Sequence, residues 1–385
     1  MLSSRISFTN FKKKKYKISK IKAELANLLK EENHILKSLS KNYKNIYNSK
    51  IIKKFQNFSN FRIIGMGGSS LGTQTIYDFL KFKIKKTFLF IDNLQAKKKI
   101  KNNKKYLNFI VSKSGNTIET IVNSNIILKK NDRNIFITED KKNYLNLLAK
   151  KLKSEIIHHN NFIGGRYSVL SEVGMLPSEF MGLNVKDFKQ YNTLIKNKKF
   201  INLLINNVSS TLYFINKKKL NSVIINYDEN SESLFKWYQQ LVAESLGKKK
   251  KGLLPIVSNM PKDNHSVMQL YLDGTQNNFF TFFYVHDRNS EKLNNSRILE
   301  SQKFLKGKNL SDITYAQKKA TEKVFKMKNI PFRSFEIKKR DERTLGQLFC
   351  FFILETILLG KSLNLNPYDQ PAVELIKQET KKILI

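Results

Sequence analysis

Short apolar runs alternate with longer amphipathic segments over most of this chain of 385 residues. The apolar runs are typical of buried strands and form two series, 61–65, 87–92, 106–112, 134–138 and 154–159, then 222–227, 253–257 and 279–285. Helical patterns lie between several of them, at 73–82, 118–130 and 231–246. Strands that alternate with helices favour parallel sheets with helices on both faces. The pattern therefore predicts an α/β protein with two doubly wound, mostly parallel sheets.

Two such series fit the chain length, because a domain holds roughly 150 residues. Residues 1–50 are rich in Lys and Asn and include a helical stretch at 21–39, so we expect an N-terminal helical segment there. We expect a first sheet domain over residues 51–190 and a second, ending in a C-terminal helix, over residues 191–385. The boundary falls in the polar stretch 184–198. A chain of this size buries complete cores without disulfide or metal support.

Composition narrows the class of protein. Hydrophobic residues make up 41% of the chain and aromatic residues 11%, which is too much for a disordered protein. The single cysteine, Cys350, excludes a disulfide framework. We find no apolar run of the roughly 20 residues that span a bilayer, and no apolar segment of a secretory signal near the N-terminus. We therefore expect a soluble, cytoplasmic protein without a membrane partner.

The net charge of +39 comes from 70 Lys and Arg against 31 Asp and Glu, a balance that first suggests nucleic-acid binding. Only nine of these residues are Arg, the side chain that reads base edges in pairs of hydrogen bonds. The lysines occur in every region together with abundant Asn and Ile, which indicates compositional drift and no placed basic face. We expect no nucleic-acid partner, although the charge could speed the encounter with small anions.

A glycine-rich turn, GMGGSSLG, follows the first strand at residues 65–72. Glycine lacks a Cβ, so the backbone N–H groups of such a turn can approach an oxygen-rich ligand at a helix N-terminus. The turn is no P-loop, because no Gly-Lys-Ser/Thr follows, and no dinucleotide motif, because position 70 is Ser. A tight loop that serves only packing remains the alternative.

A cluster of hydroxyls follows another strand of the first series. Ser112, Ser114, Thr117 and Thr120 stand within nine residues at the start of a predicted helix. Hydroxyls and free amides at a helix N-terminus form a neutral cage for a phosphate monoester. A capping role explains one hydroxyl, that of Thr117. Four hydroxyls beside a glycine turn from a second strand favour a phosphate site.

Two charged residues occupy unusual settings. Arg166 follows two glycines in NFIGGRYSVLSEVG, so either a backbone folded closely around a ligand or a surface salt bridge accounts for it. In the helix at 231–246, Glu244 falls about 20° from Trp237, on the face that also carries Leu241. A carboxylate on an apolar stripe is costly unless it is paired, and desolvation would suit it to work as a general base. A structural glutamate in a salt bridge is the alternative.

Histidine and lysine supply weaker signals. The five histidines form no HxH or HExxH pair and no cysteine cluster accompanies them, so we expect no metal ion. His265 stands at a predicted helix start, where histidine is more often structural than catalytic. Lys377 lies about 40° from Val373 on the apolar face of the C-terminal helix. Neither residue would stand out without its neighbours.

Taken together and in order, these segments resemble the glucose-6-phosphate isomerase (phosphoglucose isomerase) family of the sugar-isomerase (SIS) fold group. The resemblance covers most of the chain, from Gly65 to Lys377, through GMGGSSLG, SKSGNTIET, GGRYSVLSEVG, AESLGK, DNHSVMQL and NPYDQPAVELIK. It implies two SIS-type α/β/α sandwich domains. It also implies an aldose–ketose isomerase of glycolysis and gluconeogenesis that interconverts glucose 6-phosphate and fructose 6-phosphate without a cofactor. The reaction would proceed by ring opening and metal-free proton transfer through a cis-enediol.

The resemblance also implies roles for individual residues. Glu244 would move the proton between C1 and C2, and Arg166 would stabilise negative charge on the intermediate. His265 and Lys377 would assist ring opening. The substrate and its phosphate would be held by Gly68, Ser69, Ser112, Lys113, Ser114 and Thr117, with Gln370 close by. In the family the histidine comes from the partner subunit, so a homodimer with shared active sites is implied.

Two other functions remain open. A broadened isomerase would also accept mannose 6-phosphate, and nothing in the motifs excludes it. A non-catalytic regulator that binds a sugar phosphate on the same fold would need the phosphate cage but not Glu244, His265 and Lys377 together. The joint presence of these three residues favours the enzyme.

Overall fold

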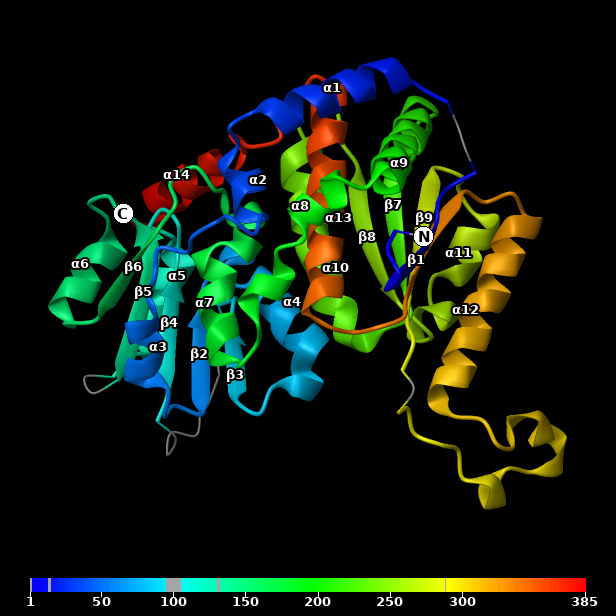
Figure 1. The fold of residues 1–385 in the computed structure, drawn as a ribbon, viewed down its shortest axis with the longest axis horizontal. Helices are drawn as coiled ribbons and strands as arrows, with labels where there is room; N and C mark the ends of the chain where they lie inside the picture. Colours follow the sequence, from blue (N-terminus) through cyan, green and yellow to red (C-terminus); the bar gives the residue numbers. More distant parts are fainter. Residues whose placement is uncertain (1, 13–14, 95–104, 130–131, 288) are drawn as a thin grey trace.

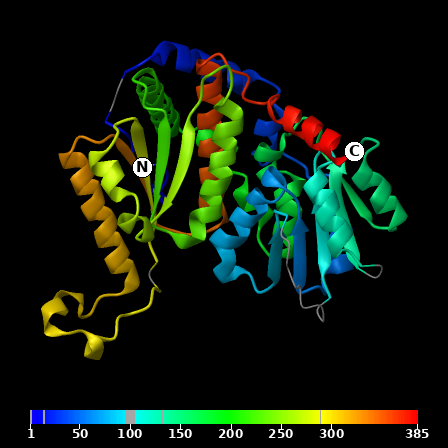
Figure 2. The same ribbon diagram turned by 180° about the vertical axis from the view of Figure 1, so that it is seen from behind.

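Two mostly parallel sheets lie side by side in the computed structural model, each covered by helices (Figures 1 and 2). The structure describes residues 2–12, 15–94, 105–129, 132–287 and 289–385. This architecture confirms the α/β class that the alternating pattern predicts.

The first sheet has the strand order β3-β2-β4-β5-β6, and all its pairings are parallel. Its strands are β2 (Asn60–Ile64), β3 (Thr87–Ile91), β4 (Leu107–Val111), β5 (Arg133–Glu139) and β6 (Glu155–His159). Its helices are α3 (Ser49–Phe55), α4 (Leu71–Leu80), α5 (Ile118–Ile127), α6 (Tyr144–Lys151) and α7 (Glu172–Phe180). Each of the five predicted strands is confirmed. The chain runs from β2 outward to β3 and then crosses back to β4, so the winding reverses between β2 and β4.

The second sheet repeats this winding with a different last strand. Its order is β8-β7-β9-β10-β1, from β7 (Asn221–Asn226), β8 (Leu254–Asn259), β9 (Asn278–Val285), β10 (Phe332–Ile337) and β1 (Ile6–Thr9). The pairings among β7 to β10 are parallel, whereas β1 runs antiparallel to β10. The N-terminal segment, which we expected to be helical, therefore also completes the second sheet.

Nine further helices complete the part of the chain that the structure describes. They are α1 (Ile18–Lys30), α2 (His34–Ser38), α8 (Tyr191–Ile195), α9 (Lys198–Asn216), α10 (Glu232–Leu246), α11 (Met268–Asp273), α12 (Leu310–Met327), α13 (Glu342–Ser362) and α14 (Val373–Leu384). The predicted helix at 21–39 is two helices, because the Asn33 side chain accepts hydrogen bonds from the amides of Ile35 and Leu36 and starts α2. We propose that the first domain ends near residue 190, where α8 begins.

Short 3₁₀ turns connect several elements. They are η1 (Gly67–Ser69), η2 (Lys81–Lys83), η3 (Gly165–Leu170), η4 (Val185–Phe188), η5 (Glu229–Ser231), η6 (Lys262–His265), η7 (Asn295–Arg297) and η8 (Glu300–Leu305). Of these, η1, η3 and η6 carry predicted site residues, and η1 and η3 contact each other.

Helix α13 contains the apolar run around Cys350. Among the described residues it is the one helix long and apolar enough to cross a membrane, which corrects our expectation that no such segment exists. However, 94% of its apolar window is buried, and it packs against α1, α9 and α10. Its hydrophobicity is thus explained by its place as a central core helix.

Candidate active site

Two loops leave the first sheet at the point where its winding reverses. The glycine loop (residues 65–70) follows β2 and the hydroxyl loop (residues 112–117) follows β4. These strands are neighbours in parallel register, so both loops start from the same edge of the sheet. In open α/β sheets, ligands bind at the carboxyl ends of the strands at such a reversal. The fold thus brings together the two loops that the sequence predicts to form one site.

Gly68 brings the glycine loop against a third segment. A Cβ at this position would lie 2.2 Å from the carbonyl carbon of Gly165 and 2.5 Å from the amide nitrogen of Arg166. A side chain would therefore force the two backbones apart. Gly67 has a φ of +53°, a conformation that favours glycine. Ser69 follows and remains half-buried at the mouth of the loop.

The hydroxyl loop contains three of the four predicted hydroxyls, those of Ser112, Ser114 and Thr117. The Oγ of Ser112 lies 2.8 Å from Oγ1 of Thr117, and the exposed Ser114 accepts a hydrogen bond from the amide of Asn116. Thr117 is the N-cap residue of α5 but makes no capping hydrogen bond, which leaves the first-turn amides available to an anion. Thr120 is buried within α5, so it does not extend the group as we expected.

Lys113 contributes to this loop mainly through its backbone. Its Nζ lies 3.3 Å from Oε1 of Glu139, which directs its charge to a carboxylate of β5. Its carbonyl oxygen accepts hydrogen bonds from the Glu139 amide and the Thr138 hydroxyl. These contacts hold the loop in place against the neighbouring strand.

Arg166 lies at the centre of the candidate site, with a side chain only 1% exposed. All five N–H donors of its guanidinium are used. The acceptors are Ser245 Oγ (2.8 Å), Glu244 Oε2 (3.1 Å), Gln370 Oε1 (2.7 Å) and the carbonyl oxygens of Pro367 (2.8 Å) and Asp369 (3.1 Å). The arginine thus joins helix α10 to the segment that precedes α14.

Glu244 lies at the rim of this cluster. Its side chain is 31% exposed, although Leu234, Trp237 and Leu241 on the same helix face are buried. The expectation of a desolvated carboxylate is therefore wrong. The physical reason is that α10 ends only two residues later, at the edge of the packed core.

Gln240 belongs to the site, although the sequence analysis did not single it out. Its Nε2 donates a hydrogen bond of 2.8 Å to Oε1 of Glu244, one helical turn away. The same nitrogen would lie 2.7 Å from a Cβ at Gly67, so Gln240 bridges the carboxylate and the glycine loop. Gln240 lies four residues before Glu244, and side chains at this spacing are neighbours on a helix. That spacing was the signal that could have identified Gln240.

His265 lies outside the cluster. It is exposed at the end of η6, and its side chain makes no hydrogen bond or ion pair with the described residues. Glu244 precedes strand β8 and His265 follows it. The six residues of β8 rise about 3.3 Å each, so this strand alone spans roughly 20 Å. Within one chain they lie at opposite ends of the sheet.

Lys377 also lies outside the cluster. Its side chain is 60% exposed, and its Nζ is 2.6 Å from Oε1 of Glu374 on the same helix. No residue of α14 is buried, so the face we expected to be packed is open. The structure brings Arg166, Glu244 and Gln370 into direct contact and leaves Lys377 exposed.

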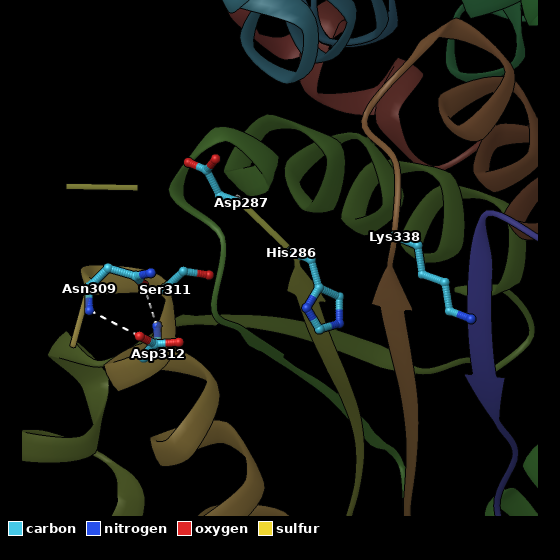
Figure 3. Close-up of a pocket in the computed structure, with 6 residues that line it drawn as sticks. All are labelled: His286, Asp287, Asn309, Ser311, Asp312 and Lys338. Atoms are coloured by element: carbon cyan, nitrogen blue, oxygen red, sulfur yellow. Dashed lines mark hydrogen bonds between the residues drawn. The ribbon is translucent and has the colours of Figure 1, made fainter. Parts of the chain in front are cut away.

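A cavity of about 420 Å³ opens elsewhere, at the carboxyl ends of β9 and β10 (Figure 3). It is lined by His286, Asp287, Asn309, Ser311, Asp312 and Lys338. The first amides of α12 already have acceptors, namely Glu291 O, Ser290 Oγ and Asn309 Oδ1. Two carboxylates face the space as well, so the cavity does not suit a phosphate. None of the predicted site residues lines it.

Among the described residues, no group of three or more His, Cys, Asp or Glu side chains is arranged to hold a metal ion. The charges of the candidate site come from Arg166 and Glu244, which neutralise each other. Proton transfer and stabilisation of negative charge are therefore the chemistry that these side chains can supply.

The fold and site define an α/β protein of the sugar-isomerase class, in which the glycine and hydroxyl loops lie beside a paired carboxylate and arginine. A glucose-6-phosphate isomerase from Chlamydia trachomatis has a similar fold, with a TM-score of 0.71 and 18% identity over 91% of this chain and 78% of that one. A hypothetical protein from Thermus thermophilus superposes with a TM-score of 0.81 and 23% identity, over 95% of this chain and 94% of that one.

Comparison of the sequence with known proteins identifies the family. The family model "Phosphoglucose isomerase" matches residues 14–385. The glucose-6-phosphate isomerase of Methanocaldococcus jannaschii is 32% identical over 350 residues, which cover 86% of this chain and 84% of that protein. The Campylobacter jejuni enzyme of the same name is 31% identical over 346 residues, 84% of this chain and 85% of that protein. The chain belongs to the phosphoglucose isomerase family, which confirms the resemblance of its motifs.

Proposed function

We propose that this chain catalyses the reversible isomerisation of glucose 6-phosphate and fructose 6-phosphate. The observation that carries the proposal is the contact between the side chains of Arg166 and Glu244, because the backbone of Arg166 lies against Gly68 of the glycine loop. Membership of the family and the names of its relatives support the same reaction. The enzyme would act in the cytoplasm, in glycolysis and gluconeogenesis.

The substrate phosphate would bind between the two loops of the first sheet. The hydroxyls and amides that would hold it belong to Gly68, Ser69, Ser112, Lys113, Ser114 and Thr117. The free first turn of α5 supports this placement, because helix N-termini favour anions. The sugar carbons would then extend toward Glu244.

Glu244 would act as the base of the open-chain reaction. Its carboxylate would take the proton from C2 of the aldose and return it to C1, while a proton moves from O2 to O1 through the cis-enediol. Arg166 would stabilise the negative charge that develops on oxygen. Since all five Arg166 donors are used, Nη1 would exchange its bond to Gln370 for one to the substrate.

The active form would be a homodimer with shared sites. His265 of the same chain is separated from Glu244 by the length of β8, which supports a histidine supplied by a second subunit. That histidine would assist ring opening. Lys377 would join it when α14, exposed in the single chain, packs against substrate or partner.

A coupled assay tests the proposed function. Purified protein is given fructose 6-phosphate, and glucose 6-phosphate is detected through reduction of NADP⁺ by its dehydrogenase. We expect turnover, and we expect Glu244→Gln to lower it by roughly 10²–10⁴-fold. Mannose 6-phosphate is assayed in parallel, and turnover of it at a comparable rate would identify a broadened isomerase. Binding of fructose 6-phosphate without turnover would instead indicate a regulator.

A further inference from the structure

The arginine loop (residues 160–171) carries Arg166 and is closed at its base by a buried charged pair. His159 is the last residue of β6 and Glu172 is the first residue of α7. The Nδ1 of His159 lies 2.9 Å from Oε1 of Glu172. The two side chains are 1% and 0% exposed. The pair thus joins the residues that immediately flank the loop.

His159 uses both of its ring nitrogens in hydrogen bonds. Its Nε2 lies 2.9 Å from the carbonyl oxygen of Ile163, and its Nδ1 faces the carboxylate of Glu172. A carbonyl and a carboxylate oxygen only accept hydrogen bonds. The imidazolium form, which donates from both ring nitrogens, matches these two acceptors. The pair is therefore a buried ion pair. Removing one partner would leave the other charge buried and uncompensated, which is strongly destabilising.

Glu172 is satisfied on both of its oxygens. Oε1 also accepts the amide of Asn160, and Oε2 accepts the hydroxyl of Tyr43, each at 2.9 Å. Burial by itself raises the pKa of Glu172, but the hydrogen bond and charge of His159 outweigh it, and the pKa lies below its usual value. The carboxylate is thus ionised at neutral pH and fixed from three directions.

Other charged and titratable groups surround the pair. Lys189, whose pKa burial lowers to about 7, is bonded to the carbonyls of Ser38 and Leu170. Tyr47 donates to Glu179 on α7, and the Nδ1 of His34 lies 3.3 Å from Nδ2 of Asn160. These contacts tie the N-terminal segment to both ends of the arginine loop. None of them touches Arg166 directly.

We propose that His159 and Glu172 are positioning residues, whose ion pair closes the arginine loop and thereby fixes the place of Arg166. The inference rests on the proposed function, because it gives Arg166 a role in the reaction. A loop held at its two ends has little freedom to shift its centre. A displacement of about 1 Å at a charge-stabilising group can lower a rate by about 100-fold.

The first experiment compares two matched variants. Glu172→Gln removes the carboxylate from His159, and Glu355→Gln removes an equally buried carboxylate from Arg333, which lies on β10 away from the loop. We expect Glu172→Gln to lower kcat at least tenfold, with KM changed less than threefold because the phosphate loops are intact. We expect Glu355→Gln to keep kcat per folded molecule within twofold of the native value.

A second variant tests rescue. In His159→Gln/Glu172→Gln, two neutral amides replace the ion pair and can bond to each other without an uncompensated buried charge. We expect its kcat to recover to within about threefold of the native value. If Glu172→Gln does not fold, Tyr43→Phe removes only the bond to Oε2, and we expect at least a twofold loss of kcat.

Three results would overturn the inference. They are a Glu172→Gln kcat within twofold of native, an equal loss in Glu355→Gln, and, if Tyr43→Phe has to be used, an unchanged kcat in that variant. Arg166→Lys, measured in the same assay, separates this failure from failure of the proposed function. If Arg166→Lys keeps its rate, the role of the arginine itself is wrong. If it loses its rate while Glu172→Gln does not, only the positioning role is wrong.

Discussion

Arg166 and Arg333 have nearly the same surroundings in the protein. Comparing them shows how a buried arginine of the candidate site differs from one that belongs to the core. Arg166 and Arg333 are each 1% exposed and each pairs with a glutamate. Each also uses all five of its donors. Those of Arg333 reach Thr281, Asn207, Tyr238 and both oxygens of Glu355. Satisfied donors therefore do not distinguish function from structure.

The glutamates make the difference. Glu355 is 2% exposed on the central helix α13, whereas Glu244 is 31% exposed at the end of α10. Burial by itself lowers the pKa of Arg333, but the charge of Glu355 outweighs it and the pKa is raised. The Arg333–Glu355 pair is closed off from solvent, so its role is structural. The pair of Arg166 is open on one side, so a substrate can reach its carboxylate.

The largest effect should follow from removing the open carboxylate. Glu244→Gln keeps the shape of the side chain but removes the base, and positioned proton transfer contributes roughly 10²–10⁴-fold. We expect kcat to fall by that factor while fructose 6-phosphate still binds and raises the Tm. Glu232→Gln, at the exposed start of the same helix, is the control and should be fully active. A Glu244→Gln variant with more than half the native rate would contradict the assignment.

The sealed pair should show the opposite behaviour. Glu355→Gln leaves the charge of Arg333 buried without its carboxylate, so we expect the free energy of unfolding to fall by about 3 kcal/mol. Urea unfolding at pH 7 measures this loss. Replacing both partners, as Arg333→Met/Glu355→Leu, should cost less than the single change. A loss below about 1 kcal/mol for Glu355→Gln would show that the pair is not what stabilises this region.

Subunit exchange tests whether His265 of a second subunit completes the site on the exposed side of the Arg166–Glu244 pair. Homodimers of Glu244→Gln and of His265→Ala should each be impaired at both sites. When a one-to-one mixture is unfolded and refolded, mixed dimers carry one doubly altered site and one native site. We expect roughly a quarter of native activity under two-fold symmetry. If mass spectrometry shows mixed dimers and the activity only equals the average of the parents, the shared site is disproved.

Removal of metal ions by a chelator should have the smallest effect on activity. The site charges come from an arginine and a glutamate that balance each other, and hydroxyls with amides suit the phosphate without a cation. We expect activity to survive dialysis against EDTA within experimental error. Loss of activity on chelation, followed by recovery with zinc, manganese or magnesium, would show that the proposed mechanism is wrong.

Much of the first domain could be predicted because its signals are local. The strands before the glycine loop and the hydroxyl loop are short apolar runs, and the loops carry glycine or hydroxyls directly after them. Strand β1 escaped prediction because the strand it pairs with, β10, lies at the other end of the chain. Gln240 escaped it because a glutamine in a helix is ordinary until the carboxylate beside it is known to be open.

The sequence by itself determined the class of fold, the order of the motifs and a set of candidate site residues, because periodicity and turn chemistry act over short windows. Only the tertiary structure decided which of them meet. Arg166 contacts Glu244 and Gln370 across 78 and 204 positions of the chain. It also decided that Glu244 is open and Glu355 is sealed, since the exposure of a side chain depends on which distant elements cover it. For the same reason His265 lies at the far end of β8 from Glu244, a separation that no local pattern records.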